Sequence, residues 1–189
     1  MNKNKLLNAM LLISHFFLVI LVLTLLALTI GLIYWHIDRE AYSYIPIQVM
    51  GNSAYVKVTW TSAVAGTNIT NTIATLNNIS ASTLYILYLQ LMAVGILVLL
   101  VLREFTQVIR SVKRIQTFVY QNIWSFKKIG MYLFWVFLLS GVQYSIFKES
   151  DLFGLYVHLT PLLLSLLSYT LSEVFKEGNT LLEENNGTI

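Results

Sequence analysis

Charged residues are absent from long stretches of this chain and are concentrated in short segments between those stretches. None occurs between Lys57 and Arg103, and none occurs from Ile129 to Phe147. Only 11% of the 189 residues are charged, whereas a typical soluble domain has about 25%. The chain has too little polar surface for a fold that faces water, so we predict a membrane protein.

Four apolar stretches have the length and composition of membrane helices. A hydrocarbon core about 30 Å thick is crossed by roughly 20 apolar residues in a helix. The first stretch is about twice as long as a signal-peptide core and has no small-residue cleavage site, so we interpret it as an uncleaved helix. The predicted spans are residues 6–35, 83–102, 129–147 and 152–171. We therefore predict a single all-α membrane domain over residues 1–189, with four transmembrane helices.

The first loop, residues 36–82, is polar and rich in Ser, Thr and Asn. Within it, residues 45–50 and 55–61 flank the turn-forming sequence Gly-Asn-Ser. The second of these arms, YVKVTWT, is rich in β-branched and aromatic residues, which favour strands. The pattern predicts a small β-hairpin on the side of the membrane opposite the termini.

The distribution of Lys and Arg predicts the orientation, because cytoplasmic loops carry an excess of basic residues. With four spans, both termini lie on the same side as residues 103–128. The basic residues on that side are Lys3, Lys5, Arg103, Arg110, Lys113, Arg114, Lys127, Lys128 and Lys176; those on the other side are Arg39, Lys57 and Lys148. Nine against three predicts that both termini and residues 103–128 lie in the cytoplasm.

Residues 103–128, here called the basic segment, form the most distinctive surface. Six basic residues and Glu104 give it a net charge of +5. As a helix, its apolar residues share one face and its basic residues the opposite one, an amphipathic pattern. The apolar face consists of Phe105, Val108, Ile109, Val112, Ile115 and Val119. We predict a cytoplasmic helical hairpin that turns near Phe118, with Asn122 as the N-cap of its second helix.

Three explanations compete for the charge of the basic segment. Anchoring against anionic lipid contributes about 1 kcal/mol per basic residue near the membrane surface. A docking site for a cytoplasmic protein is the second explanation. The third, direct contact with nucleic acid, is disfavoured because one short hairpin cannot build a DNA-binding fold.

The tail, residues 172–189, carries the opposite charge. Four glutamates and Lys176 give it −3 before the terminal carboxylate. Gly178 suits the position after a helix C-terminus, and Thr180 with Glu183 fits a capping box that starts a last short turn. Because tail and basic segment lie on one side of the membrane, we expect either that they pack together or that the tail is solvated.

Two sequence patterns resemble a bacterial family known as domain of unknown function 2975. The family pattern V-F-x-x-G, L-x-x-E-x, T-I is matched in the tail by Val174, Phe175, Gly178, Leu181 or Leu182, Glu184, Thr188 and Ile189. The family pattern F-x-x-x-N-x-x-x-L-x-x-I-G is matched by Phe118, Asn122, Ile129 and Gly130. Phe126 stands where the family has Leu, Thr117 where it has Pro, and Asn186-Gly187 where it has Asp-Leu.

This resemblance implies a four-helix bacterial inner-membrane protein with no assigned activity. It also implies a genomic neighbourhood, because members are often encoded beside a small helix-turn-helix regulator. That regulator is the partner that the resemblance suggests.

No group of residues in the sequence forms a catalytic, cofactor or metal site. Cysteine is absent, and no predicted span has Asp, Glu, Lys or Arg at its middle, where one would indicate a transport path. The polar residues that stand out within spans are His15, Gln90, Gln143 and His158. They either form interhelical hydrogen bonds or line the path of a small transporter or channel subunit.

Pairs of small residues four positions apart permit close helix contact. Ala27 with Gly31 and Gly141 with Ser145 are such pairs. They fit contacts within one chain and contacts between copies equally, so a monomer and a homo-oligomer both remain open.

The leading hypothesis is a non-enzymatic membrane protein that regulates or holds a soluble partner through its cytoplasmic face. The partner would dock on the basic segment and the tail. The candidate partner-binding residues are Arg103, Arg110, Lys113, Arg114, Phe118, Asn122, Glu173, Phe175, Glu177 and Glu184.

Overall fold

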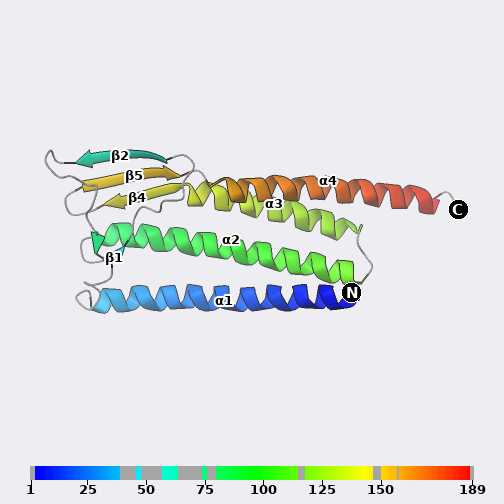
Figure 1. Cartoon of the computed structure of the whole chain (residues 1–189), viewed down its shortest axis with the longest axis horizontal. Helices are drawn as coiled ribbons and strands as arrows, with labels where there is room; N and C mark the ends of the chain where they lie inside the picture. The colour runs from blue at the N-terminus through cyan, green and yellow to red at the C-terminus, as the bar shows by residue number, and fades with distance from the viewer. Residues whose placement is uncertain are drawn as a thin grey trace. The chain divides into compact units, whose positions relative to one another are not determined.

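Four long helices dominate the computed structural model of this chain. It describes residues 3–38, 46–47, 57–63, 74–75, 80–114, 118–146, 150–156 and 158–187. The helices are α1 (Lys3–Ile37), α2 (Ala81–Lys113), α3 (Tyr120–Ser140) and α4 (Leu159–Gly187), in the order shown in Figure 1. The described strands are β1 (Pro46–Ile47), β2 (Lys57–Ala63), β3 (Ala74–Thr75), β4 (Val142–Ile146) and β5 (Ser150–Tyr156).

Three of the four helices are long and apolar enough to cross a membrane. They are Lys5–Ile37, Ala81–Lys113 and Tyr120–Ser140. In α4 the uncharged part covers only residues 159–172, which is about 21 Å at 1.5 Å per residue. This is shorter than a hydrocarbon core of about 30 Å. The fold therefore supports a helical membrane protein with three candidate spans and a fourth, amphipathic helix.

Two predicted helical segments are strands in the structure. Residues 142–146 form β4 instead of the end of the third span, and residues 152–156 belong to β5 instead of the start of the fourth. The prediction of helix for these residues is wrong because α3 ends at Ser140, before Gly141, and the short aromatic and β-branched runs that follow suit strands. A short apolar run cannot be assigned to helix or strand from its hydropathy alone.

The predicted strand within residues 55–61 is confirmed from Lys57 on, but its partner differs from the prediction. β2 pairs antiparallel with β5, and β5 pairs antiparallel with β4, giving the order β2-β5-β4. β1 pairs with β3 in a separate ladder. The register places Trp60, Phe153 and Tyr144 in one row across the three strands. The sheet joins β2 of the first loop to β5 and β4. The local sequence of the loop did not indicate this pairing.

Contacts within the chain divide it into two compact units. Unit 1 comprises Met1–Leu23, Gly95–Val136 and Leu159–Ile189, and unit 2 comprises Thr24–Val94 and Phe137–His158. Unit 2 contains the strands and contacts between the polar side chains of its helices. The Thr29 hydroxyl lies 3.0 Å from the Tyr88 hydroxyl, and Gln90 Nε2 donates to the Leu139 carbonyl oxygen at 2.6 Å. Unit 1 contains the basic segment and the tail.

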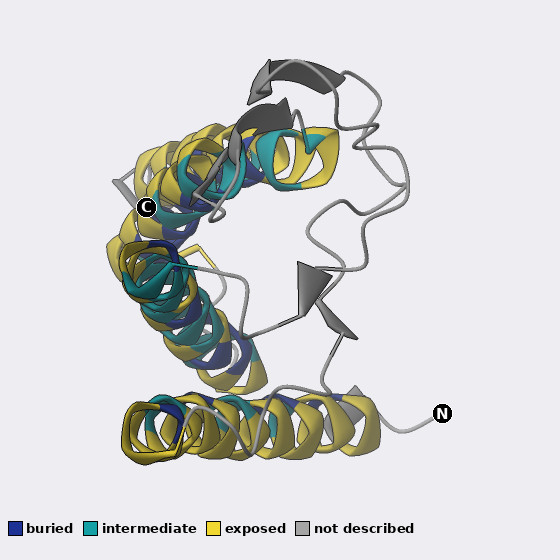
Figure 2. Cartoon of the chain, turned by 90° about the vertical axis from the view of Figure 1, so that its left-hand side faces the viewer, coloured by how far each residue is buried: buried dark blue, intermediate teal, exposed yellow. Residues whose placement is uncertain are grey.

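The hydrophobic core of the described residues lies in unit 1. Val108, Phe126 and Ile129 are buried, and Val101, Val112, Leu133, Leu171 and Phe175 pack against them. In contrast, α1 is mostly exposed along its length (Figure 2). Its buried residues in unit 1, Leu7 and Ser14, are seven positions apart and share one narrow face. Unit 1 thus has its tightest packing where the sequence is most highly charged.

Candidate functional site

The basic segment is a packed helical pair, as its amphipathic pattern predicts. Val108 and Ile109 on the predicted apolar face are 6% and 5% exposed, and α2 gives way to α3 through a turn at Phe118. Asn122 differs from its predicted role. α3 begins at Tyr120, and the Asn122 side chain, which is 0% exposed, donates from Nδ2 to Ser111 Oγ at 3.0 Å. Asn122 therefore ties α3 to α2 instead of capping α3.

A carboxylate of α2 makes a second polar connection between these helices. Glu104 Oε2 accepts a hydrogen bond of 2.8 Å from Ser125 Oγ, and Glu104 Oε1 lies 3.4 Å from Lys128 Nζ. The Glu104 side chain is 12% exposed and that of Lys128 46%. Since a nearly buried carboxylate needs such partners, these contacts fix the lateral alignment of α2 and α3.

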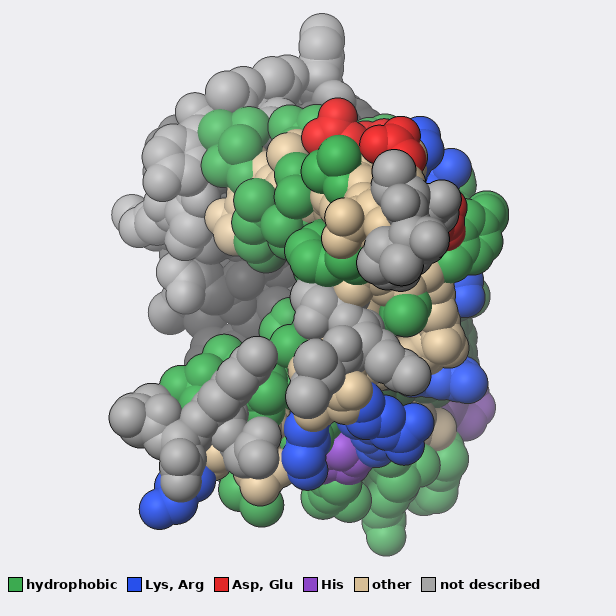
Figure 3. Space-filling view, turned by 90° about the vertical axis from the view of Figure 1, so that its right-hand side faces the viewer, with side chains coloured by type: hydrophobic (Ala, Val, Ile, Leu, Met, Phe, Trp, Pro, Cys, Tyr) green, Lys and Arg blue, Asp and Glu red, His purple; other side chains and the backbone are tan. Residues whose placement is uncertain are grey.

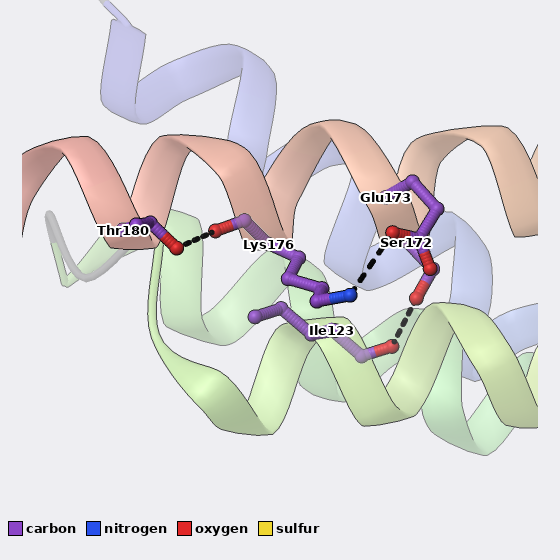
Figure 4. Close-up of polar contacts among 5 residues, drawn as sticks. All are labelled: Ile123, Ser172, Glu173, Lys176 and Thr180. Carbon is purple, nitrogen blue, oxygen red and sulfur yellow. Dashed lines mark hydrogen bonds and ion pairs between the residues drawn. The ribbon is translucent and has the colours of Figure 1, made fainter.

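α4 is attached to α3 by hydroxyl groups that reach its backbone. Ser172 Oγ donates to the Ile123 carbonyl oxygen at 3.0 Å (Figure 4), and Ser165 Oγ donates to the Gly130 carbonyl oxygen at 2.7 Å. Both serines are buried. A Cβ on Gly130 would come within 3.0 Å of the Tyr169 ring, so glycine permits the close approach of the two helices.

Aromatic rings extend the α3–α4 contact toward the C-terminus of α4. The Phe175 ring centroid lies 5.4 Å from that of Phe118 and 4.8 Å from that of Phe126. A Cβ on Gly178 would come within 2.5 Å of the Phe118 ring. Gly178 therefore gives Phe118 room to lie against α4.

Gly178 does not end α4, and the predicted capping box at Thr180 does not form. The helix continues to Gly187, and Thr180 Oγ1 donates to the Lys176 carbonyl oxygen at 3.2 Å, an interaction within the helix (Figure 4). Glu173 and Lys176 form an ion pair of 3.3 Å one turn apart on the same helix. The tail does pack against the basic segment, through the aromatic contacts of Phe175 and the hydrogen bond from Ser172 to Ile123.

The predicted partner-binding residues fall into two groups. Phe118, Asn122 and Phe175 contact the chain's own helices, as described above. The charged residues are exposed: Arg103, Arg110, Lys113 and Arg114 on α2 and just after it, and Glu173, Glu177 and Glu184 on α4. On the face of Figure 3, basic side chains gather around a histidine, and acidic side chains form a separate group. The charged group alone forms the candidate interaction surface.

His15 of α1 is part of this basic surface, a contact that no pattern in the sequence indicates. Arg110 Nη2 donates to His15 Nε2 at 3.0 Å, and His15 Nδ1 donates to the Leu11 carbonyl oxygen at 2.7 Å. These contacts fix the Nδ1–H tautomer and hold the Arg110 guanidinium against α1. The residues are 95 positions apart, so the contact depends on tertiary structure alone.

The four polar residues of the transporter hypothesis lie in different elements of the fold. His15 belongs to the basic surface of unit 1, and Gln90 donates to a backbone carbonyl in unit 2. Gln143 lies on β4, and His158 precedes α4. Two of the four are therefore outside the helices.

The fold and its surface define an integral membrane protein whose apolar helices end in a packed, charged unit. Residues 68–189 match the family described as Protein of unknown function (DUF2975), and the chain belongs to this family. No curated protein and no solved structure matches the chain significantly. The two sequence patterns that carry the resemblance meet where Phe118 packs on Phe175 and Gly178 of α4, while Asn122 of the first pattern binds Ser111 of α2.

Removing the Asn122 side chain should measurably weaken unit 1. We expect Asn122→Ala to lower the free energy of unfolding by about 1–3 kcal/mol, because the change empties a fully buried site and removes the hydrogen bond to Ser111. Gln121→Ala removes a similar amide from the adjacent exposed position and should change the free energy by less than about 0.5 kcal/mol. Denaturant titration in micelles measures both values, and equal effects would contradict the packing described here.

Proposed function

We propose that this chain is a non-enzymatic protein of the bacterial inner membrane that holds or regulates a soluble cytoplasmic protein. Both termini and the charged part of unit 1 face the cytoplasm, as the excess of Lys and Arg on that side favours. The docking surface consists of the basic group on α2 and the acidic group on α4. The small helix-turn-helix regulator suggested by the family resemblance is the proposed partner.

The observation that carries this proposal is the packed core beneath the charged residues. A segment that served only to anchor the chain on anionic lipid would need its charges and no fixed arrangement of them. Here Val108, Phe126 and Ile129 are buried under the segment, and Arg110 is held by His15. Side chains fixed in this way lose less conformational entropy on binding, which favours recognition of a partner with a complementary surface.

The charge of the surface indicates the chemistry of that partner. Lys113 ends α2 one turn after Arg110 and Arg114 follows it directly, so the three cations are neighbours. Complementary charge across an interface directs encounter and orientation. We therefore expect the partner to present carboxylates toward the end of α2.

Reversing these three charges should release the partner from the membrane. The variant is Arg110→Glu, Lys113→Glu and Arg114→Glu, and we expect at least about a tenfold loss of co-purified partner, because like charges across an interface cost several kcal/mol. The measurement is quantitative mass spectrometry of proteins cross-linked to the tagged chain in native membranes.

A matched control separates this effect from the orientation signal. Lys5→Glu, Lys127→Glu and Lys176→Glu remove the same charge from the same side, and all three positions are exposed but dispersed over α1, α3 and α4. The control should retain the partner. Loss of the partner in both variants, or retention in both, would contradict docking on the end of α2.

A further inference from the structure

One side of the α1–α2 pair faces away from α3. Val108 marks the side of α2 that packs in the core with Phe126 of α3. Arg110 follows it by two positions, which places it about 160° around the helix, and its side chain contacts His15 of α1. His15 is about 100° from its neighbour Ser14, which is 5% exposed and marks the buried side of α1. The contact between His15 and Arg110 therefore lies on an outer side of unit 1.

Steps of seven residues extend this outer side toward the membrane. Each step returns to within about 20° of the same direction and advances about 10 Å along a helix. On α1, one step leads from His15 to Val22. On α2, two steps lead from Arg110 to Arg103 and Ile96. Consecutive spans run antiparallel, so both series point the same way. Val22 and Ile96 are 37% and 49% exposed, and Arg103 is exposed too. We call these five residues the arginine flank.

The two arginines of the flank lie at the level of lipid headgroups. The charge-free part of α2, residues 81–102, measures about 33 Å, close to a hydrocarbon core of about 30 Å. Arg103 follows this part directly, so it lies at the edge of the hydrocarbon. The headgroup layer adds roughly 5–8 Å on each side, and Arg110 lies about 10 Å beyond Arg103. The phosphate groups of lipids therefore lie between the two arginines, within reach of both long side chains.

Neither arginine is neutralised by a carboxylate in the part of the chain that the structure describes. The ion pairs found there join Glu104 to Lys128 and Glu173 to Lys176. His15 accepts one hydrogen bond from Arg110 and, with its proton on Nδ1, carries no charge. Arg110 thus keeps its charge and most of its N–H donors, while the bond to His15 holds its guanidinium on the flank. Two cations left at headgroup level attract an anion.

We propose that the arginine flank binds one anionic phospholipid. Its phosphate lies between Arg103 and Arg110, whose guanidinium donors match phosphate oxygens, and an acyl chain follows Val22 and Ile96 into the hydrocarbon. A soluble acidic protein fits this flank less well, because Arg103 borders the hydrocarbon, where a partner from water does not reach. The lipid site goes beyond the proposed function, which uses the outer end of α2, and does not depend on it.

Native mass spectrometry, which counts the lipids bound to a protein released from detergent micelles, tests this site. The purified chain is titrated with dioleoylphosphatidylglycerol or with dioleoylphosphatidylcholine, which carries the same chains and no net charge. We expect the first phosphatidylglycerol to bind at least about tenfold more tightly than the first phosphatidylcholine. Arg103→Gln with Arg110→Gln should abolish this preference. Lys127→Gln with Lys176→Gln removes two exposed cations from α3 and α4 and should keep it.

Two further measurements separate the site from a folding defect and from a site for free phosphate esters. Arg103→Gln alone removes no ion pair of the described residues, so it should keep the circular dichroism spectrum of the wild type and still weaken phosphatidylglycerol binding several-fold. Glycerophosphoglycerol, the same headgroup without acyl chains, should compete only at far higher concentration, because it leaves Val22 and Ile96 uncovered.

Three results would overturn the inference: equal affinity of the wild type for the two lipids, equal losses in the arginine and lysine variants, or competition by the free headgroup as strong as that by the lipid. The second result would mean that the total charge of the chain attracts the lipid, and the third would assign the flank to a soluble phosphate ester. None of these results bears on the soluble partner, whose binding is measured by co-purification and requires Lys113 and Arg114.

Discussion

Replacing Gly178 with leucine is expected to detach α4 from α3 and to lower the free energy of unfolding by about 1–3 kcal/mol, the usual cost of an overpacked site. Even the first side-chain carbon would come within 2.5 Å of the Phe118 ring. That ring is held by Phe175, so it cannot move without breaking the aromatic contact. The cost exceeds the gain of roughly 0.5–1 kcal/mol from removing a glycine from a helix.

Gly31→Leu is the matched control for this substitution. It lies within α1, and a Cβ there has no atom within 4 Å. We expect no loss of stability at Gly31, and a small gain from helix propensity. Phe118→Ala should partly rescue Gly178→Leu, because it removes the ring that the new side chain displaces. Denaturant titration in micelles gives the free energy of unfolding of Gly178→Leu, Gly31→Leu, Phe118→Ala and the double variant Gly178→Leu with Phe118→Ala. A Gly178→Leu protein as stable as the control would show that α4 does not approach Phe118 closely.

Removing the Phe175 ring should strongly destabilise unit 1. We expect Phe175→Ala to lower the free energy of unfolding by about 2–4 kcal/mol, slightly below the range for fully buried phenylalanine, because Phe175 is only partly buried. The ring contacts both Phe118 and Phe126, so its loss opens the core as well as the α3–α4 contact.

Phe105→Ala serves as the comparison, since Phe105 is a phenylalanine of the same unit that is 42% exposed. It should cost less than about 1 kcal/mol. Limited proteolysis provides an independent measurement: in Phe175→Ala the C-terminal half of α4 should be cut much faster than in Phe105→Ala. Equal cleavage rates in the two variants would mean that Phe175 does not hold α4 in place.

The membrane class and three of the helices could be predicted from the sequence, because long charge-free runs have few alternatives to a membrane helix. The turn at Phe118 and the buried face around Val108 followed from helical periodicity. The strands β4 and β5 could not be predicted in this way. β4 follows α3 and β5 precedes α4 in the chain, and their hydropathy does not distinguish them from those helices. Their sheet is completed by β2, about 90 residues earlier in the chain, and local patterns carry no information about such pairing.

The charged surface could be located from the sequence, but its internal organisation could not. Glu104 and Ser125 are ordinary residues in the sequence, and only the packing of α2 on α3 brings them together. Asn122 resembled an N-cap because Asn is favoured there, yet its buried amide binds Ser111. Phe118, Asn122 and Phe175 match the family pattern and are predicted to bind a partner, whereas the structure uses them to pack the helices together.

The central claim is that the charged part of unit 1 binds protein and that Phe126 and Phe175 pack in the core beneath it. Site-specific photo-crosslinking in living cells tests it most directly, with the reactive residue at Lys113, at Glu177, or at Phe126, which is 9% exposed. The account predicts protein adducts from Lys113 and Glu177, with their mass showing a second copy or a different protein, and no intermolecular adduct from Phe126. Adducts with lipid alone at both exposed positions would contradict it.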